Sequence, residues 1–175
     1  MQALFQGPLG MTVAHNPKAQ MIGAAPAVRA TVISARPQMT ADLIARTGLD
    51  DAMLTRLVHG FYDRIRADPL LGPIFADHVN DWGPHLAKMV DFWSSVALMT
   101  GRYHGAPMPK HLPLPVDAEH FNRWLALFRA TATEICPPTG AAWVIDRAER
   151  IAASIQMNLQ DARGNYGCAD LPPQL

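Results

Sequence analysis

His111 is the residue of this sequence best suited to bind a metal ion. It lies between Pro107 and Pro113 in the segment PMPKHLP, where prolines restrict the backbone and apolar residues surround the imidazole. A neutral imidazole held in this way can present one fixed nitrogen to a metal. Taken alone, however, a single histidine is more often a packed core residue than a ligand.

Three other residues carry polar atoms on helix faces that are otherwise apolar: Tyr62, His85 and Trp124. Each has an ordinary structural explanation when it is considered separately. A buried tyrosine commonly bonds a backbone carbonyl, and a tryptophan is most often a core residue whose indole N–H meets the backbone. His85 follows Pro84 near an expected helix start, where it could also face solvent or swing outward.

The elements that would position these residues are helices with one apolar face. From Asp50 or Asp51, apolar residues recur at helical spacing as far as Ile65, and Pro69 predicts an end near Asp68. A shorter helix from Thr40 to Thr47 should precede it and end at Gly48. The following run, Leu70 to Phe75, contains Gly and Pro, which predicts a tight turn or a short 3₁₀ segment.

The second half of the chain should contain three more helices and one loop. One helix is expected from about Trp82 or Pro84 to Thr100, with Gly101 as its left-handed cap. Residues 101–116 contain too many Gly and Pro residues for a long helix and predict an anchored loop. Asp117 should cap a further helix that stops before Pro137-Pro138. Thr139 should cap the last helix, which frays after Leu159.

The overall pattern predicts an all-α fold in a single domain. No alternating strand pattern, internal repeat or Gly-rich phosphate loop occurs, which disfavours an α/β nucleotide-binding fold. Residues 1–10 contain LFQGP, similar to a viral 3C protease site from an expression vector, and are set aside. We expect a flexible arm over 11–38, the folded domain over 39–163 and a flexible tail over 164–175.

Composition excludes several classes of protein. The 175 residues are 49% hydrophobic, with four Trp and nine Met, enough for a substantial core. Fifteen basic residues balance fifteen acidic ones without clustering, which argues against binding to nucleic acid. The sequence contains no apolar stretch of about 18 residues, so no membrane span is expected. The two cysteines lack metal-ligand or disulfide spacing, and a cytoplasmic protein is expected.

Several separate motifs resemble those of the group III truncated haemoglobins, in the same order and at the same spacing. The resemblance extends from about Thr40 to Asp161. The segments that carry it are Phe61-Tyr62, Leu71 to Phe75 (LGPIF), His85 with Phe92-Trp93, Gly101 to Pro115 (GRYHGAPMPKHLPLP) and His120 to Phe128 (HFNRWLALF).

This resemblance implies a truncated globin, a two-over-two helical sandwich around haem b (iron protoporphyrin IX). It implies that His111 is the proximal iron ligand and that Tyr62, His85 and Trp124 are the distal polar residues. Phe75 would pack on the haem face. The other expected cofactor contacts are Met89, Trp93 and Met108 in the pocket, and Lys88 and Arg102 as partners of the propionates.

The expected function is binding of diatomic gases, O₂, NO and CO. Donors in the distal pocket favour oxidative chemistry such as nitric-oxide dioxygenation, or peroxidase-like activity, with electrons from an external reductase because the chain contains no flavin or nicotinamide domain. The alternative is a non-enzymatic oxygen carrier, store or gas sensor. A third interpretation is a haem-free helical module in which His111 fills a core.

Overall fold

The computed structural model describes residues 36–167, and side chains as far as residue 164. This range contains seven helices and, as expected, no strand. The proposed vector remnant and most of the predicted arm lie outside the described residues, as does 168–175 of the predicted tail. No described helix is long and apolar enough to cross a membrane. The helices are α1 (Pro37–Thr47), α2 (Asp51–Ala67), α3 (Gly72–His78), α4 (Trp82–Leu98), α5 (Met108–His111), α6 (Ala118–Ile135) and α7 (Pro138–Gly167).

The helix starts at Asp50 and Asp117 are confirmed, because both aspartates are N-caps. The Asp50 carboxylate accepts a hydrogen bond from the Met53 N–H at 2.7 Å. The Asp117 carboxylate accepts bonds from the first-turn N–H groups of α6, and His120 completes a capping box. These bonds satisfy N–H groups that have no partner within the helix.

Two short helices occupy segments where we expected irregular backbone. The predicted turn over Leu70 to Phe75 is confirmed only for Leu70 and Leu71, because α3 begins at Gly72. Pro73 lies in its first turn, where a missing N–H removes no helical bond. For the same reason Pro109 is compatible with the first turn of α5, which lies within the loop expected at 101–116.

The bounds of α1, α4 and α7 differ from the prediction, and α1 begins at Pro37 rather than Thr40. Helix α4 ends at Leu98 rather than Thr100, and its cap is Met99 with a φ of 56°, although Gly101 is also left-handed. The Thr40 hydroxyl donates to the Leu98 carbonyl at 2.8 Å, which satisfies an acceptor at this end. Helix α7 begins at Pro138, so Thr139 is not its cap, and it continues past the expected fraying point to Gly167.

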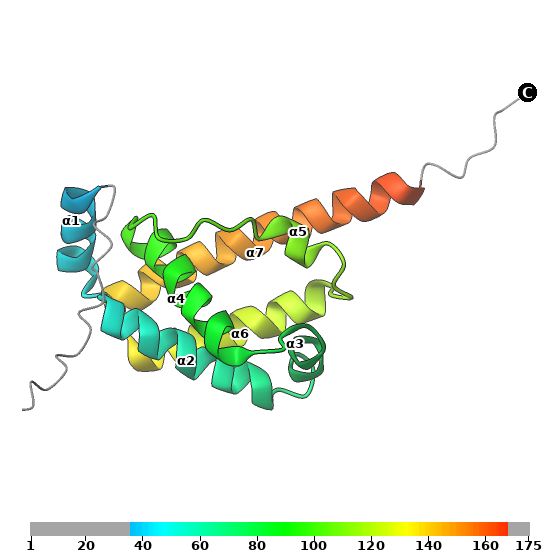
Figure 1. Ribbon diagram of the computed structural model, residues 1–175, viewed down its shortest axis with the longest axis horizontal. Helices are drawn as coiled ribbons and strands as arrows, with labels where there is room; N and C mark the ends of the chain where they lie inside the picture. Colours follow the sequence, from blue (N-terminus) through cyan, green and yellow to red (C-terminus); the bar gives the residue numbers. More distant parts are fainter. Residues whose placement is uncertain (1–35, 168–175) are drawn as a thin grey trace, which may run out of the picture. The chain divides into compact units, whose positions relative to one another are not determined.

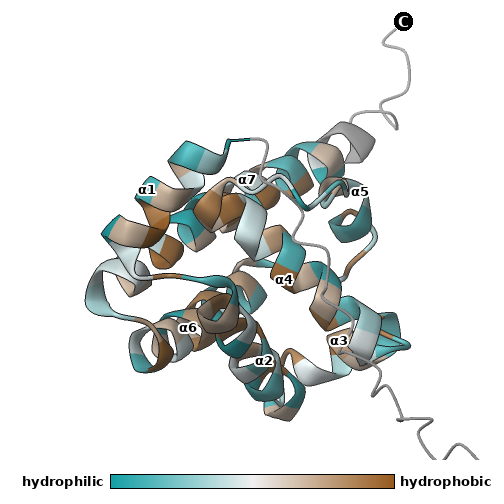
Figure 2. Ribbon diagram, turned by 60° about the vertical axis from the view of Figure 1, so that its left-hand side comes forward, coloured by the Kyte–Doolittle hydropathy of each residue, from teal (hydrophilic) through white to brown (hydrophobic). Residues whose placement is uncertain are grey.

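The helices pack as two pairs. Helix α2 lies against α4, α6 lies against α7, and α2 packs on α6 to join the pairs. Helix α1 contacts α4 and α7, whereas α5 contacts α7 alone among the described helices. Figure 1 shows α1 and α5 at separate places along the long helix α7. Hydrophobic and hydrophilic residues alternate along the helices in Figure 2, as expected for helices with one buried face.

The buried side chains form two hydrophobic clusters. The main cluster contains residues from α1, α2, α4, α6 and the first half of α7. The second cluster contains Val116, Ile155 and Leu159, with partly buried residues packed on them from α3, α5, α6 and α7. A domain usually has one contiguous core plus smaller satellite clusters under long loops, and the second cluster here is the smaller of the two. The division therefore separates the α4 side of the molecule from the α5 side.

We expect the backbone at the end of α1 to require glycine at position 48. Its φ is 69°, and an added Cβ would lie 3.1 Å from the Cγ of Pro137. Gly48→Ala should therefore lower the free energy of unfolding by roughly 1–2 kcal/mol, measured by urea denaturation. Gly164→Ala is the matched control, because Gly164 is helical and has no atom within 4 Å of the added Cβ. Equal effects of the two substitutions would contradict this explanation.

Candidate cofactor site

His111 ends α5 with one ring nitrogen already bonded. Its Nδ1 lies 2.8 Å from the Pro107 carbonyl oxygen and donates a hydrogen bond to it. This bond fixes the ring orientation and leaves the lone pair on Nε2 for another partner. Metal-ligating histidines commonly have this arrangement. The chain that follows α5 is also held, because Arg163 on α7 donates to the carbonyls of Leu114 and Val116 at 3.0 and 2.9 Å.

Tyr62 and His85 lie together on the α2 and α4 side. Their ring centroids are 5.1 Å apart and nearly perpendicular. Tyr62 is 5% exposed. The Nε2 atom of His85 is buried and has no hydrogen-bond partner among the described residues. Burial, and secondarily the charge of Lys88, lower the pKa of His85, so its imidazole is neutral at physiological pH.

Trp124 and Phe75 join this group through ring contacts. Phe61 lies between Tyr62 and Trp124. Its ring centroid is 5.1 Å from the centroid of each of these two residues. Phe75 lies 5.8 Å from Tyr62. The structure thus brings Tyr62, His85, Phe75 and Trp124 into one aromatic group.

One aromatic residue of this group was absent from the sequence-based prediction. Trp82 contacts Tyr62, His85 and Phe75, with ring centroids 6.0, 5.6 and 6.5 Å apart. The signal that could have found it is its spacing, since residues three apart on a helix lie on the same face and His85 is three residues after Trp82. Trp82 therefore forms part of the wall around Tyr62 and His85.

Two hydrogen-bond donors of this group have no acceptor in the part of the chain that the structure describes. They are the Tyr62 hydroxyl and the Trp124 indole N–H, neither of which is hydrogen-bonded to another described residue, whereas the fully buried side-chain atoms without a partner are His85 Nε2 and Arg102 Nε. By contrast, the Trp143 indole N–H donates to the Ala97 carbonyl at 2.9 Å. Buried tyrosines and tryptophans usually find an acceptor. Both groups are thus available to a ligand.

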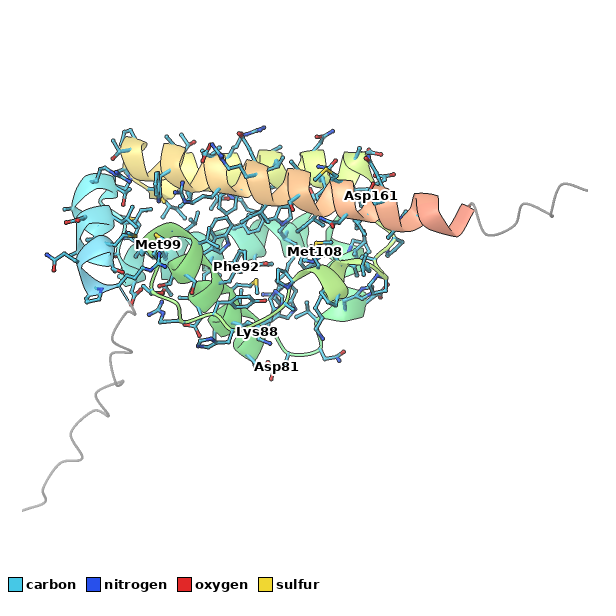
Figure 3. The ribbon with its side chains drawn as sticks, turned by 90° about the horizontal axis from the view of Figure 1, so that it is seen from above. Asp81, Lys88, Phe92, Met99, Met108 and Asp161 are labelled. Carbon is cyan, nitrogen blue, oxygen red and sulfur yellow. The ribbon has the colours of Figure 1, made fainter. Side chains whose placement is uncertain are left out.

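The remaining predicted contacts are divided between the two clusters. Met89 and Trp93 belong to the main cluster on the α4 side, and Trp93 is 2% exposed. Met108 packs on the second cluster. In Figure 3, Lys88 and Phe92 lie on α4 and Met108 lies on α5. The predicted pocket residues therefore come from both sides of the divided core.

Lys88 and Arg102 line the same cavity, which has a volume of about 400 Å³ and also borders Asp91 and Tyr103. Arg102 is already paired, because its guanidinium donates to both Asp51 carboxylate oxygens at 2.7 and 3.0 Å. Its Nε lies 3.3 Å from an Asp91 oxygen. These ion pairs give Arg102 a structural role that the sequence-based prediction missed. Contacts with propionates stay a prediction for both residues.

The residues present fit a flat, apolar cofactor whose metal takes one protein ligand. Helices α4 and α5 make no contact with each other in the described structure. The buried Nε2 of His85 on the α4 side lacks a partner. His111 on the α5 side has Nε2 available for a metal. No group of three or more His, Cys, Asp or Glu that could hold a metal occurs among the described residues. Haem supplies the other metal ligands from its porphyrin.

Comparison with known proteins identifies the family. Residues 43–157 match the family model for bacterial-like globins. The chain belongs to this family. This globin is 32% identical over 122 residues to group 3 truncated hemoglobin ctb of Campylobacter jejuni, covering 67% of this chain and 96% of that protein. It is 28% identical over 83 residues to group 2 truncated hemoglobin YjbI of Bacillus subtilis, covering 46% and 63% of the two chains.

A solved structure supports the same assignment. The crystal structure of group III truncated hemoglobin from Campylobacter jejuni matches with a TM-score of 0.60 and 33% sequence identity. The match covers 63% of this globin and 91% of that chain. The predicted all-α truncated globin fold is therefore confirmed, as is the resemblance to group III truncated haemoglobins. Membership of the family implies haem-based binding of diatomic gases.

A buried ion pair holds the α2 end of the site against α6. The Asp68 carboxylate accepts hydrogen bonds from the N–H groups of Leu70 and Leu71 at 3.0 Å and from Arg123 Nε at 2.6 Å. Burial alone would raise the pKa of Asp68, but these bonds outweigh it and lower the pKa. Because Arg123 precedes Trp124, the pair fixes the start of the segment that carries Trp124.

Asp68→Asn should destabilise this globin at neutral pH by about 2 kcal/mol, since hydrogen bonds to a charged group are lost. The folded pKa lies below the unfolded one, so the stabilisation is complete above the unfolded pKa. It is lost as the pH falls through the folded pKa. Urea denaturation should therefore show the difference from wild type shrinking below about pH 4. Asp63→Asn, in an exposed 3.8 Å pair with Arg66, is the control. A pH-independent difference would contradict this account.

Proposed function

We propose that this globin binds haem b through Nε2 of His111 and uses Tyr62, His85 and Trp124 to hold a diatomic gas. The observation that carries the proposal is the division of the core. One side presents His111 with its second nitrogen bonded to Pro107, and the other presents the unpartnered Nε2 of His85. A single axial histidine leaves one coordination position of haem iron open for O₂, NO or CO.

Tyr62 and Trp124 would act as donors to the gas ligand. Dioxygen becomes partly negative when it is held in a globin pocket, so it gains more from hydrogen-bond donors than carbon monoxide does. If each donor contributes about 1–2 kcal/mol, the two together slow oxygen escape roughly 30- to 1000-fold. Slow escape favours chemistry on the ligand over delivery. Burial of Tyr62 raises its pKa, so the hydroxyl stays protonated as a donor.

The reaction we propose is oxidative chemistry of nitric oxide in the cytoplasm, with electrons from an external reductase. Lys88 is proposed to pair with a propionate, because it is exposed on α4 beside the approximately 400 Å³ cavity. Arg102 would contribute to the same region while it keeps its bonds to Asp51. Phe75, Met89, Trp93 and Met108 would supply apolar contacts to the porphyrin.

The test is a set of optical and kinetic measurements on the haem-loaded full chain. Spectra of the ferric, reduced and oxygenated protein report axial ligation, and stopped-flow mixing gives the oxygen dissociation rate. Nitric oxide is then added to the oxygenated protein and nitrate is quantified. Slow dissociation with stoichiometric nitrate supports the proposal. Fast dissociation without nitrate would instead identify a carrier, store or sensor, and absence of a Soret band after haem addition would exclude haem binding.

A further inference from the structure

Seven aromatic rings form a continuous series from the surface to the candidate gas-binding site. Neighbouring ring centroids lie 4.6 to 5.5 Å apart along the whole series. Along this series, redox-active Tyr or Trp rings alternate with redox-inert Phe rings. The order is Tyr103, Phe92, Trp93, Phe128, Trp124, Phe61 and Tyr62.

We propose that this series conducts single electrons from Tyr103 to the buried site, so that Tyr103 is the residue on which an oxidising equivalent comes to rest. The redox-active rings are each separated by one phenylalanine, and electron tunnelling is efficient across such short gaps. Trp93 and Phe128 are stacked with centroids 4.6 Å apart, and Trp124 and Phe128 are stacked at 5.3 Å. Phe92, on α4 in Figure 3, bridges Trp93 and Tyr103.

The two tyrosines at the ends differ in whether they can release a proton. Oxidation of a phenol to a neutral phenoxyl radical requires loss of the hydroxyl proton. Tyr62 is 5% exposed, so little water reaches its hydroxyl, which is hydrogen-bonded to no other described residue. Tyr103 is half-buried and lines the cavity of about 400 Å³ together with exposed His104. Water can therefore take the proton from Tyr103, which makes it the stable end of the series.

The electron balance of the step is simple. A one-electron oxidant, such as the azidyl radical, takes one electron from a tryptophan of the series, and the indole N–H releases a proton to water. The oxidant becomes azide. An electron then moves from Tyr103 to the oxidised tryptophan, which also regains a proton from water, while the Tyr103 phenol releases its proton. A soluble one-electron donor restores Tyr103. Transfer of the oxidising equivalent to Tyr103 would protect Trp124 and Tyr62 from permanent oxidation.

Pulse radiolysis of the full chain with azidyl radicals tests this proposal without relying on gas chemistry. The Tyr166→Phe background leaves Tyr62 and Tyr103 as the tyrosines, since the sequence contains three. We expect the indolyl absorption to decay as the phenoxyl absorption grows, at a rate independent of protein concentration. Tyr103→Phe should abolish the phenoxyl growth. Phe92→Leu should slow it, because both redox-active neighbours stay while the bridging ring is lost.

Trp143→Phe is the matched control, because Trp143 packs against Arg46 and Arg147 outside the series. It should lower the initial indolyl yield and leave the rate of phenoxyl growth unchanged. Circular dichroism verifies the fold of each variant, and Tyr103→Phe decides the question if Phe92→Leu does not fold. Phenoxyl growth that persists in Tyr103→Phe, or that is absent from the background protein, would overturn the proposal. Either result is independent of whether haem is bound through His111.

Discussion

His111→Ala should abolish stable haem incorporation. His111 is the only histidine of α5, and its Nε2 is the nitrogen left available by the bond from Nδ1 to Pro107. Alanine removes the proposed iron ligand while the Pro-rich segment keeps its backbone. The purified variant should show no Soret band after reconstitution and gel filtration, whereas wild type retains one haem per chain. Added imidazole should partly restore a haem spectrum by filling the space of the deleted ring.

The control for this experiment is His59→Ala. His59 is an exposed histidine on α2 with no part in the proposed site. Its substitution removes an imidazole from the surface and should leave the haem content unchanged. A normal five-coordinate spectrum in His111→Ala would refute the assignment of the iron ligand. Loss of haem in both variants would point to general instability of the fold.

Tyr62→Phe and Trp124→Phe should each accelerate oxygen dissociation by about tenfold, equal to ~1.4 kcal/mol. Both substitutions remove a donor and keep an aromatic ring in the cluster around Phe61. Stopped-flow displacement of oxygen by carbon monoxide measures the rates. The double variant measures coupling, because independent donors should give multiplicative effects. Carbon monoxide dissociation should change much less, since that ligand gains little from donors.

Trp143→Phe is again the control, because its indole N–H donates to the Ala97 carbonyl on α4 and is therefore not available to a ligand. It should leave the oxygen dissociation rate unchanged. Unchanged rates in Tyr62→Phe and Trp124→Phe would mean that these donors do not reach the ligand. A single responsive variant would assign the stabilisation to that residue alone.

The main helices could be predicted because their sequences combine caps with apolar periodicity. Asp50 and Asp117 cap α2 and α6 as expected. The errors lie where Gly and Pro occur at helix starts. Gly72-Pro73 predict a break and Thr139 predicts a cap, but proline is tolerated in the first turn of a helix, so α3 begins at Gly72 and α7 at Pro138. Met99 took the left-handed cap expected of Gly101, which no local propensity would indicate.

The aromatic group of the site could be predicted only as a set of residues. The resemblance to group III truncated haemoglobins indicated Tyr62, His85 and Trp124, and the structure places them in one group through Phe61. The ion pairs of Arg102 and of Asp68 join residues 51 and 55 positions apart in the chain. Such long-range pairs leave no periodic signal in a single sequence, so tertiary structure is needed to find them.

If haem binds between the two hydrophobic clusters as proposed, the supply of cofactor would set the lifetime of the chain. Ile74 and Phe75 are neighbours on α3, yet they pack on different clusters, and α5 rests on α7 alone among the described helices. A group that binds between the clusters stabilises the folded state by mass action, in proportion to the logarithm of its free concentration. Amide protons of α5 should therefore exchange fastest in cells starved of iron. Degradation of unloaded chains would then match the amount of this globin to the porphyrin that the cell can provide.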